Sequence, residues 1–300
     1  MRTLRRLAYL SIGIAYIQIV FGAIVRITGS GMGCGDHWPR CLGSWLPDLG
    51  NAQTGIELTH RLLGTLLGIA ILALYGFALR EQRRGTPNAK SVFRGAQLSV
   101  LIVVAVGLLG REAVKMSLQH YIIVIHLVGA ISLLAILAAT AIRAGGFGAD
   151  RDLSGVTAGT SRGALGAVAL SFVVLVMGAL TANFPGAAGS CGGFPWCRTA
   201  MAGGPPLHIQ LTHRVLAFLL VFHVMGLVIG IAKRGAPTVV SRAAKISFGL
   251  VLLQIVIAAA LVEMRLPRSL QSLHQAVGTL VWLAIFVFAM LARKGVKDNA

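Results

Sequence analysis

The sequence carries little charge, and very little of that charge is negative. Only 12% of the 300 residues are charged, and 9 residues are Asp or Glu. A typical soluble domain has about 25% charged residues. In contrast, 56% of this chain is hydrophobic. The composition therefore argues against a soluble globular protein and favours a membrane protein.

The chain also lacks long polar stretches, and apolar runs recur along its length. A helix of about 20 apolar residues crosses the hydrocarbon core of a bilayer. Eight such runs are present, at about 5–27, 58–80, 92–111, 119–142, 163–182, 208–232, 243–262 and 270–292. The first run is too long for a typical signal peptide and lacks a small-residue cleavage site. We therefore expect an all-α membrane protein with eight transmembrane helices.

The sequence has no basic run interleaved with stacking aromatic residues, which argues against nucleic acid as a partner despite the formal charge of +18. With a cytoplasmic N-terminus, 18 of the 27 Lys and Arg residues fall in the inner segments. Basic residues of membrane proteins concentrate on the cytoplasmic side. This bias predicts a multi-pass protein with both termini in the cytoplasm.

Cysteine is scarce and confined to two segments. The four residues are Cys34, Cys41, Cys191 and Cys197. In the predicted topology both segments face outward, where thiols oxidise readily. We therefore expect the disulfides Cys34–Cys41 and Cys191–Cys197. They either staple the loops or, for the first pair, act in redox chemistry. A zinc site is less favoured, because each cluster is a lone pair with its own spacing.

The two halves of the chain resemble each other. Glu57-Leu58-Thr59-His60 returns 153 positions later as Gln210-Leu211-Thr212-His213, and Arg follows each copy. Four helices per half would insert both halves in the same orientation, related by a pseudo-two-fold axis along the membrane normal. We expect two pseudo-symmetric four-helix bundles, 1–143 and 162–300. The linker between them, 144–161, is rich in turn-forming residues.

Four histidines fall at matching places in the two halves. They are His60, His126, His213 and His274, each in an even-numbered apolar run. An ionisable side chain inside a membrane is costly and marks a functional site by default. In each half, the two helices that carry the imidazoles enter the membrane from the same side. The two rings can therefore face each other across a bundle. Such a pair suits the two axial ligands of a haem iron.

A small residue lies four positions after each of these histidines. These residues are Gly64, Ala130, Ala217 and Gly278. They share a helix face with the imidazole, so they would leave room for a flat macrocycle. Alternatively, they serve helix packing. A single histidine of this kind would more simply form an interhelical hydrogen bond, and zinc or copper is a further alternative, with Glu57 as an added ligand.

The halves differ at one chemically important position. Glu57 precedes His60 by one turn, and Gln210 takes the matching place before His213. A carboxylate can accept a proton or stabilise a cationic intermediate, whereas an amide cannot. The first half is therefore predicted to be reactive and the second to retain a cofactor. The alternative is that Glu57 merely favours a helix N-terminus.

Several of these motifs together resemble one known family. The residues are the run Thr28-Gly29-Ser30-Gly31-Met32-Gly33-Cys34-Gly35, Trp38-Pro39, Cys41, Glu57, His60-Arg61, His126, the second Cys pair, His213-Arg214 and His274. They resemble the haem A synthases of bacteria, which are related to the mitochondrial assembly factor of the same activity. The resemblance covers nearly the whole chain, and the combination of loop and Glu-His motif is specific.

This resemblance implies a reaction and a role for each site residue. Such enzymes oxidise the C8 methyl group of haem O to a formyl group, which gives haem A for cytochrome oxidase. Two hydroxylations are proposed for them, after which the diol loses water. By the resemblance His60 and His126 flank the substrate haem, His213 and His274 ligate haem b, and Glu57 is catalytic. The first Cys pair is implied in electron or haem handling, and the second is more structural.

The hypothesis includes a location and partners. The expected location is the cell membrane of a bacterium, with the Cys loops extracytoplasmic. Expected contacts are the lipid bilayer and haem O, and haem O synthase, cytochrome oxidase assembly factors and a homo-oligomer are candidates. Two rival functions stay open: a b-type dihaem cytochrome that transfers electrons to or from quinone, and a haem transporter.

Overall fold

The computed structural model describes residues 1–297, and within them eight helices are long and apolar enough to cross a membrane. The helices are α1 (Arg2–Ile27), α2 (Ala52–Arg83), α3 (Ala89–Lys115), α4 (His120–Arg143), α5 (Ala158–Asn183), α6 (Gly204–Arg234), α7 (Thr238–Glu263) and α8 (Arg268–Lys297). The predicted all-α membrane fold with eight spans is confirmed. Several helices exceed the apolar runs, and α2 begins six residues before its predicted start.

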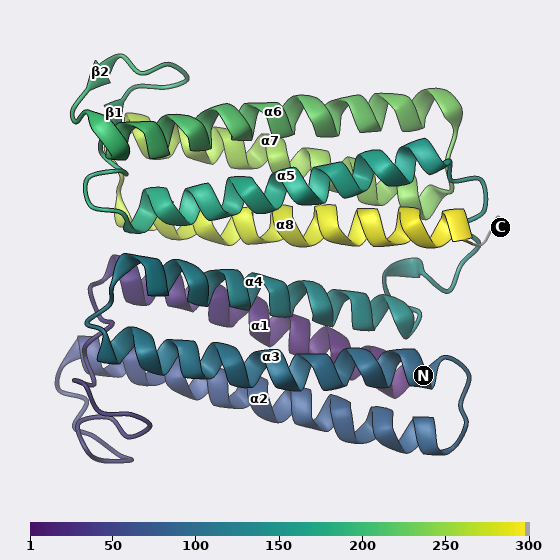
Figure 1. Cartoon of the computed structure of the whole chain (residues 1–300), viewed down its shortest axis with the longest axis horizontal. Coiled ribbons are helices and arrows are strands. Elements are labelled where there is room, and N and C mark those ends of the chain that lie inside the picture. Colours follow the sequence, from purple (N-terminus) through teal and green to yellow (C-terminus); the bar gives the residue numbers. More distant parts are fainter. Residues whose placement is uncertain (298–300) are drawn as a thin grey trace. The chain divides into compact units, whose positions relative to one another are not determined.

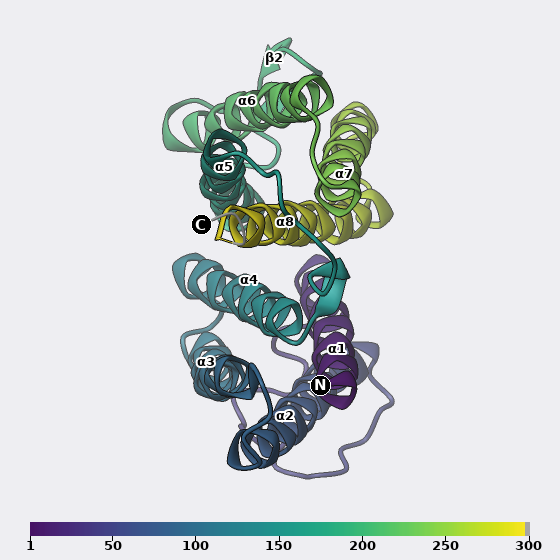
Figure 2. The same ribbon diagram turned by 90° about the vertical axis from the view of Figure 1, so that its right-hand side faces the viewer.

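The chain divides into two compact units, Met1–Ala144 and the part from Gly145 onward. Within the first unit each of α1 to α4 packs on the next, and α1 packs on α4. Within the second unit α5 to α8 pack in the same cyclic order. Figure 1 shows each set of four helices from the side, and Figure 2 shows each nearly end-on. Each unit is thus a closed four-helix bundle with an enclosed interior.

Hydrophobic side chains are divided between the bundle interiors and the outer helix faces. In the second unit the buried cluster consists of Ala167, Leu220, Val224, Val251, Ile257, Val277, Val281 and Ile285. Large apolar side chains also stay exposed outside, including Leu101 at 61% and Val256 at 65%. Lipid tails solvate such faces as readily as a protein core does. The outer faces therefore fit a multi-pass membrane protein.

The turns that join α3 to α4 and α7 to α8 share one geometry. Ser117 and Leu118 have positive φ, as do Arg265 and Leu266, which lie 148 positions later. The amide of Leu118 donates to the carbonyl of Ala113, and that of Leu266 to Leu261, both at 2.8 Å. The offset between the two His-bearing helices α4 and α8 is therefore also the offset between α3 and α7.

The segment predicted as a linker packs on the second unit. It contains a 3-10 turn, η1 (Gly146–Gly148). Leu153 is fully buried, and Lys294 Nζ of α8 donates to the carbonyl of Ala149 at 2.8 Å. The turn and coil character read from the sequence is present, but this hydrogen bond and the close approach of Leu153 to Gly295 tie the segment to α8.

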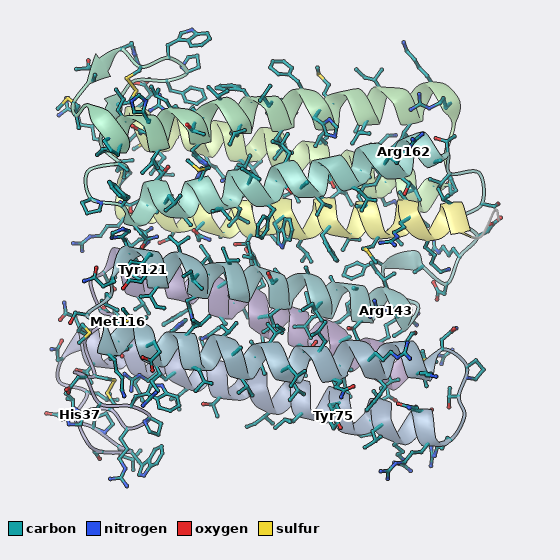
Figure 3. All side chains as sticks on the ribbon, viewed as in Figure 1. His37, Tyr75, Met116, Tyr121, Arg143 and Arg162 are labelled. Carbon is teal, nitrogen blue, oxygen red and sulfur yellow. A yellow bond between two sulfur atoms is a disulfide. The ribbon has the colours of Figure 1, made fainter. Side chains whose placement is uncertain are left out.

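Cysteine loops lie at one end of each unit. In the first unit Figure 3 places His37, Met116 and Tyr121 at the same end, and Arg143 at the opposite end. In the second unit the Cys loop includes a two-stranded ladder, β1 (Cys191–Gly192) paired antiparallel with β2 (Thr199–Ala200). This short ladder was not predicted. It is too brief to leave an alternating pattern in the sequence.

Candidate functional site

The histidines of the second unit face each other across its interior. The ring centroids of His213 on α6 and His274 on α8 are 6.5 Å apart, with the rings inclined by 78°. His213 Nδ1 donates to the main-chain carbonyl of Val174 on α5 at 3.0 Å. Metal–imidazole bonds are about 2 Å long, so one iron held between two rings would put their centroids roughly 6 Å apart. The pair fits a bis-imidazole iron centre.

The first unit brings the other two histidines together. His60 on α2 and His126 on α4 are close enough to interact electrostatically. Nδ1 of each ring is buried and has no hydrogen-bond partner within residues 1–297. Phe21 stacks on His60 at a centroid distance of 6.4 Å. Buried ring nitrogens without partners are rare in finished cores, and they are suited to accept a ligand or a metal.

These pairs lack the further side chains of a protein-only metal site. Among the described residues no group of three or more His, Cys, Asp and Glu side chains has an arrangement that would hold a metal ion. An iron bound by two imidazoles would need a partner that brings the remaining donors. A tetrapyrrole does so, because its four nitrogens leave two axial positions for histidine.

Glycines on the preceding helices make room for three of the rings. A Cβ added to Gly22 would lie 3.1 Å from Cε1 of His60, one added to Gly110 3.2 Å from Cε1 of His126, and one added to Gly178 2.9 Å from Cε1 of His213. The role of these glycines in seating the imidazoles appears only when helices are packed together.

The small residues after the histidines have a more specific neighbour than the sequence suggested. A Cβ on Gly64 would lie 3.2 Å from Nε2 of Gln18, and one on Gly278 would lie 3.2 Å from Nε2 of Gln254. The two glycines therefore admit glutamine side chains from α1 and α7. Sequence reasoning missed both glutamines, because their positions are not repeated between the halves.

Glu57 lies at the junction of α2 and the first Cys loop. Its side chain is buried, with the residue 3% exposed. Oε2 accepts a hydrogen bond from the main-chain amide of Cys34 at 2.8 Å, and Oε1 accepts one from Arg61 Nε at 3.1 Å. Arg61 Nη1 also donates to the carbonyls of His37 at 2.9 Å and Arg40 at 3.0 Å. Together Glu57 and Arg61 hold the loop on the helix.

In the second unit the uncharged side chain of Gln210 likewise holds the Cys loop on its helix. It is 4% exposed. Its Oε1 accepts from Ser190 Oγ at 2.7 Å, and its Nε2 donates to the carbonyl of Ala188 at 3.0 Å. Arg214 donates to the carbonyls of Gly193 at 2.7 Å and Cys191 at 2.9 Å. Arg61 and Arg214 thus bind loop carbonyls, a role the sequence did not indicate.

Both expected disulfides are formed. Cys34 is bonded to Cys41, and Cys191 to Cys197. The first loop also lies directly on α2, since Thr54 Oγ1 donates to the carbonyl of Gly33 at 2.8 Å. A Cβ at Gly33 would come within 2.3 Å of the carbonyl oxygen of Gln53, so only glycine fits this approach. The disulfide and Glu57 are therefore parts of one structure.

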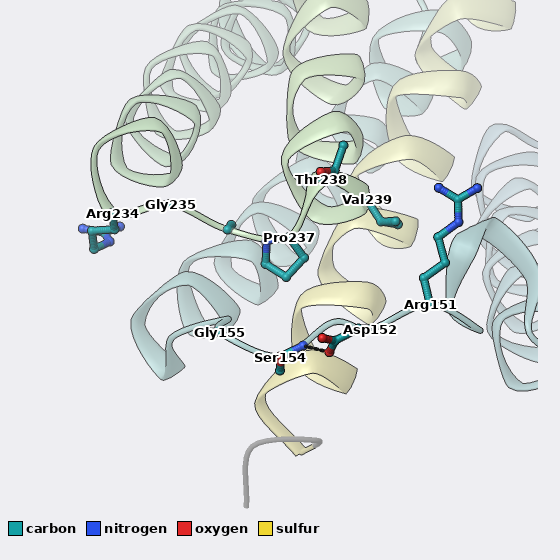
Figure 4. Close-up of a pocket in the computed structure, with 10 residues that line it drawn as sticks. Arg151, Asp152, Ser154, Gly155, Arg234, Gly235, Pro237, Thr238 and Val239 are labelled. Carbon is teal, nitrogen blue, oxygen red and sulfur yellow. Dashed lines mark hydrogen bonds between the residues drawn. The ribbon is translucent and has the colours of Figure 1, made fainter.

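A pocket of about 620 Å³ lies elsewhere, at the far end of α6 (Figure 4). It is lined by Arg151, Asp152, Ser154, Gly155, Arg234, Gly235, Ala236, Pro237, Thr238 and Val239. The backbone amide of Ser154 lowers the pKa of Asp152. Arg234 is 21 residues beyond His213, about 30 Å along the helix, so this pocket is separate from the histidines.

The fold and the site define a class: a multi-pass membrane protein with a pair of interior histidines in each of two four-helix bundles. The family model for cytochrome oxidase assembly proteins, COX15-CtaA, matches residues 5–286. The chain belongs to this family.

Individual relatives carry more specific names. A protein of Geobacillus kaustophilus named heme A synthase is 31% identical over 210 residues, which cover 68% of this chain and 64% of that protein. One of Alkalihalophilus pseudofirmus with the same name is 29% identical over 94% of both chains. A protein of Thermus thermophilus named protoheme IX farnesyltransferase is 39% identical over 171 residues, 54% of this chain. The chain spans 27% of that longer protein and less than two thirds of the Geobacillus protein.

Proposed function

We propose that this chain is a haem A synthase, which oxidises the C8 methyl group of haem O to a formyl group and so supplies haem A to cytochrome oxidase. One observation carries the proposal. Each bundle holds an interior histidine pair, but within residues 1–297 a buried carboxylate lies only at the mouth of the first bundle. The names of the relatives support the substrate class.

The two pairs have different tasks. In the first unit His60 and His126 flank the substrate haem O. In the second, His213 and His274 ligate haem b, and the 6.5 Å between their ring centroids supports this assignment. A bound haem b would supply reversible one-electron chemistry at its iron. Residues 1–143 then form the substrate half, 162–300 the cofactor half, and 144–161 the cytoplasmic linker.

Glu57 is the residue we assign to catalysis. Its carboxylate is buried, and Arg61 and the amide of Cys34 fix its position. A fixed carboxylate can hold or move a proton at the outer edge of the substrate site, whereas Gln210 keeps the same shape without this capacity. Arg61 keeps Glu57 oriented, and the Cys34–Cys41 loop screens the site from bulk water.

The proposal includes topology and partners. Both termini lie in the cytoplasm of a bacterium, and the Cys loops lie outside the cell membrane. Haem O synthase is the protein partner best supported, because a relative named for farnesyl transfer contains a stretch similar to this chain within a much longer polypeptide. Cytochrome oxidase assembly factors and a second copy of this chain complete the proposed partners.

Expression in cells that make haem O but lack haem A tests the function directly. Haems extracted from these cells and separated by chromatography should include haem A only when the chain is present. An electron-transferring cytochrome or a transporter would leave haem B and haem O alone. Finding no haem A in cells with well-expressed, haem-loaded protein would refute the proposal in favour of one of these two.

The ligand assignment has its own test. His213→Ala or His274→Ala should abolish the low-spin haem b spectrum of the purified protein, because one axial ligand is lost. His223→Ala is the matched control, since this ring bonds the carbonyl of Gly163 at 2.9 Å and lies on another face of α6. A retained low-spin spectrum in both ligand variants would show that the pairing is wrong.

A further inference from the structure

One histidine of each bundle is contacted by a glutamine from a neighbouring helix. In the first unit Gln18 Nε2 on α1 donates to the main-chain carbonyl of His60 at 3.0 Å and lies 3.4 Å from the ring Nε2. In the second unit Gln254 Nε2 on α7 donates to the carbonyl of His274 at 3.0 Å and lies 3.1 and 3.2 Å from its ring nitrogens. The two contacts have the same form.

The two glutamines do not correspond to each other in the repeat. The residue 156 positions after Gln18 is Val174, and the residue 148 positions before Gln254 is Val106. These offsets are those of Gly22 to Gly178 and of the α3–α4 turn to the α7–α8 turn. The glutamine therefore accompanies the α2 histidine in one bundle and the α8 histidine in the other.

The other two histidines lie beside main-chain carbonyl groups of valine residues. The carbonyl of Val174 binds Nδ1 of His213 at 3.0 Å, and the carbonyl of Val106 lies near His126, whose Nδ1 makes no hydrogen bond within residues 1–297. The residues after these histidines match the division. Glycine stands four positions after each glutamine-contacted histidine, and alanine after each of the others. Each bundle thus holds one imidazole beside a valine carbonyl and one beside an amide side chain.

An unused acceptor lies on each glutamine. Oε1 of Gln18 and Oε1 of Gln254 are buried without a hydrogen-bond partner in the described part of the chain. A buried polar atom without a partner destabilises the folded protein. An imidazole that binds a metal through one nitrogen carries hydrogen on the other, and it almost always donates that hydrogen to an acceptor. In the structure the amide nitrogen Nε2 of each glutamine faces the ring, so the amide must turn over to present its oxygen to a ring N–H.

We propose that Gln18 and Gln254 are positioning residues for haem ligation, whose amide oxygens accept the ring N–H of His60 and His274 once the other ring nitrogen binds iron. The inference rests on the proposed function, since it needs iron at these histidines. It assigns His60 and His274 as the side-chain-supported ligands of the two sites, and His126 and His213 as those supported by a carbonyl.

The second unit gives the sharper test. Gln254→Val copies the residue found at Val106, so the substitution fits this type of position. The full-length variant should retain low-spin haem b but lose it to a haem scavenger such as apomyoglobin about 10–100-fold faster, in line with the usual effect of removing such a partner. Its midpoint potential should rise, because a ligand without an acceptor for its N–H is less basic.

Gln254→Glu keeps an acceptor and should restore haem retention while lowering the midpoint potential below that of the wild type. Gln97→Val is the matched control, since Gln97 is exposed on α3, and it should change neither quantity. A merely structural role for Gln254 would lower thermal stability and leave the potential unchanged. That result, or a Gln254→Val protein with unchanged haem loss, overturns the inference.

Gln18 is tested with ferric protohaem as the probe. Titrated into protein whose haem b site is filled, protohaem should bind Gln18→Val about 10–100-fold more weakly than the wild type, and Gln18→Glu should bind it normally. Equal affinities would overturn the assignment for His60. The two levels of failure are distinguishable: a wild-type protein that binds no haem refutes the proposed function, whereas haem binding indifferent to both glutamines refutes only this inference.

Discussion

At the scale of single residues, Glu57 and Gln210 show how a repeat can diverge without a change of shape. Both are buried, and both hold a Cys loop through hydrogen bonds. Glu57 does so as a carboxylate paired with Arg61, and both Arg61 and Arg214 also bind loop carbonyls. A carboxylate is therefore not required to hold the Cys loop on the helix, because an amide does so in the second half. The charge of Glu57 instead fits the catalytic role proposed for it.

The first prediction follows from this difference. Glu57→Gln retains an acceptor for the amide of Cys34, so the loop should stay in place, but haem A formation should fall by about 10²–10⁴-fold, the usual range for losing a proton-transfer group. The spectrum of haem b should be unchanged. Chromatography of extracted haems and an absorption spectrum of the same purified protein measure both.

Gln210→Glu is the control for that experiment. It adds a buried carboxylate in the second unit, so it should lower the stability of this unit but should not replace Glu57 in catalysis. Haem A formation near the wild-type level in Glu57→Gln would show that the carboxylate only fastens the loop.

At the scale of helices, close approach depends on glycine where an imidazole faces the preceding helix. Gly178 on α5 illustrates this, because an added Cβ would lie 2.9 Å from Cε1 and 3.4 Å from Nδ1 of His213. The neighbouring helix α6 also contains Gly226, which would meet nothing within 4 Å. The two positions differ in what surrounds them and not in helix propensity.

The second prediction uses this pair. An exposed Gly→Ala change inside a helix usually stabilises it by about 0.5–1 kcal/mol, and Gly226→Ala should behave in this way. Gly178→Ala should instead displace the His213 ring and reduce the content of haem b. The variants are compared by their haem content per protein and by thermal unfolding in detergent. Equal haem content would argue that the His213 ring does not depend on close contact with α5.

The third prediction concerns the first Cys loop as an element. Removing the Cys34–Cys41 bond by serine substitution at both positions should loosen the segment that Glu57 and Arg61 hold, since a short closed loop contributes about 2–3 kcal/mol. Limited proteolysis should then cut between residues 35 and 51, and haem A formation should decrease. The bundle and haem b should persist.

The same change at Cys191 and Cys197 is the comparison. It should expose the second loop to protease and leave haem A formation nearer normal, because the carboxylate that this loop binds, Glu263, is exposed and not buried at the bundle mouth. An identical loss of haem A in both double variants would assign the two disulfides the same structural role.

At the scale of the whole molecule, two bundles of the same cyclic order each carry one histidine pair and one disulfide-closed loop. Four helices in each unit bring the chain back to the side on which it started. The distribution of Lys and Arg predicts that the loops of both units lie on one side of the membrane and the basic segments on the other.

The fourth prediction tests that topology. A fluorescent protein fused after the last residue should fluoresce, as it does in the cytoplasm, whereas alkaline phosphatase fused there should be inactive. Alkaline phosphatase inserted between residues 45 and 50 should be active, because this loop is expected outside. The reverse pattern of activities would invert the proposed orientation, and with it the oxidising location of both disulfides.

The sequence predicted the spans well because hydrophobic length is a local property that the bilayer selects. It also predicted the disulfides that the structure contains, since few residues were available to pair. The site was only partly accessible. The four histidines were found from their repetition, but their assignment as haem ligands remains a prediction. Gln18 and Gln254 were missed because the matching positions of the other half hold Val174 and Val106. A comparison of the two halves therefore does not single out either glutamine.

What the sequence by itself determined is the set of local properties: eight apolar helices, a basic side, two cysteine loops and the exchange of a carboxylate for an amide. Only the tertiary structure decided which groups meet. The amide of Cys34 reaches Glu57 across 23 residues, and Gln254 reaches His274 from another helix. Such contacts depend on how one helix is rotated and seated against the next, and side-chain volumes throughout a bundle set this together.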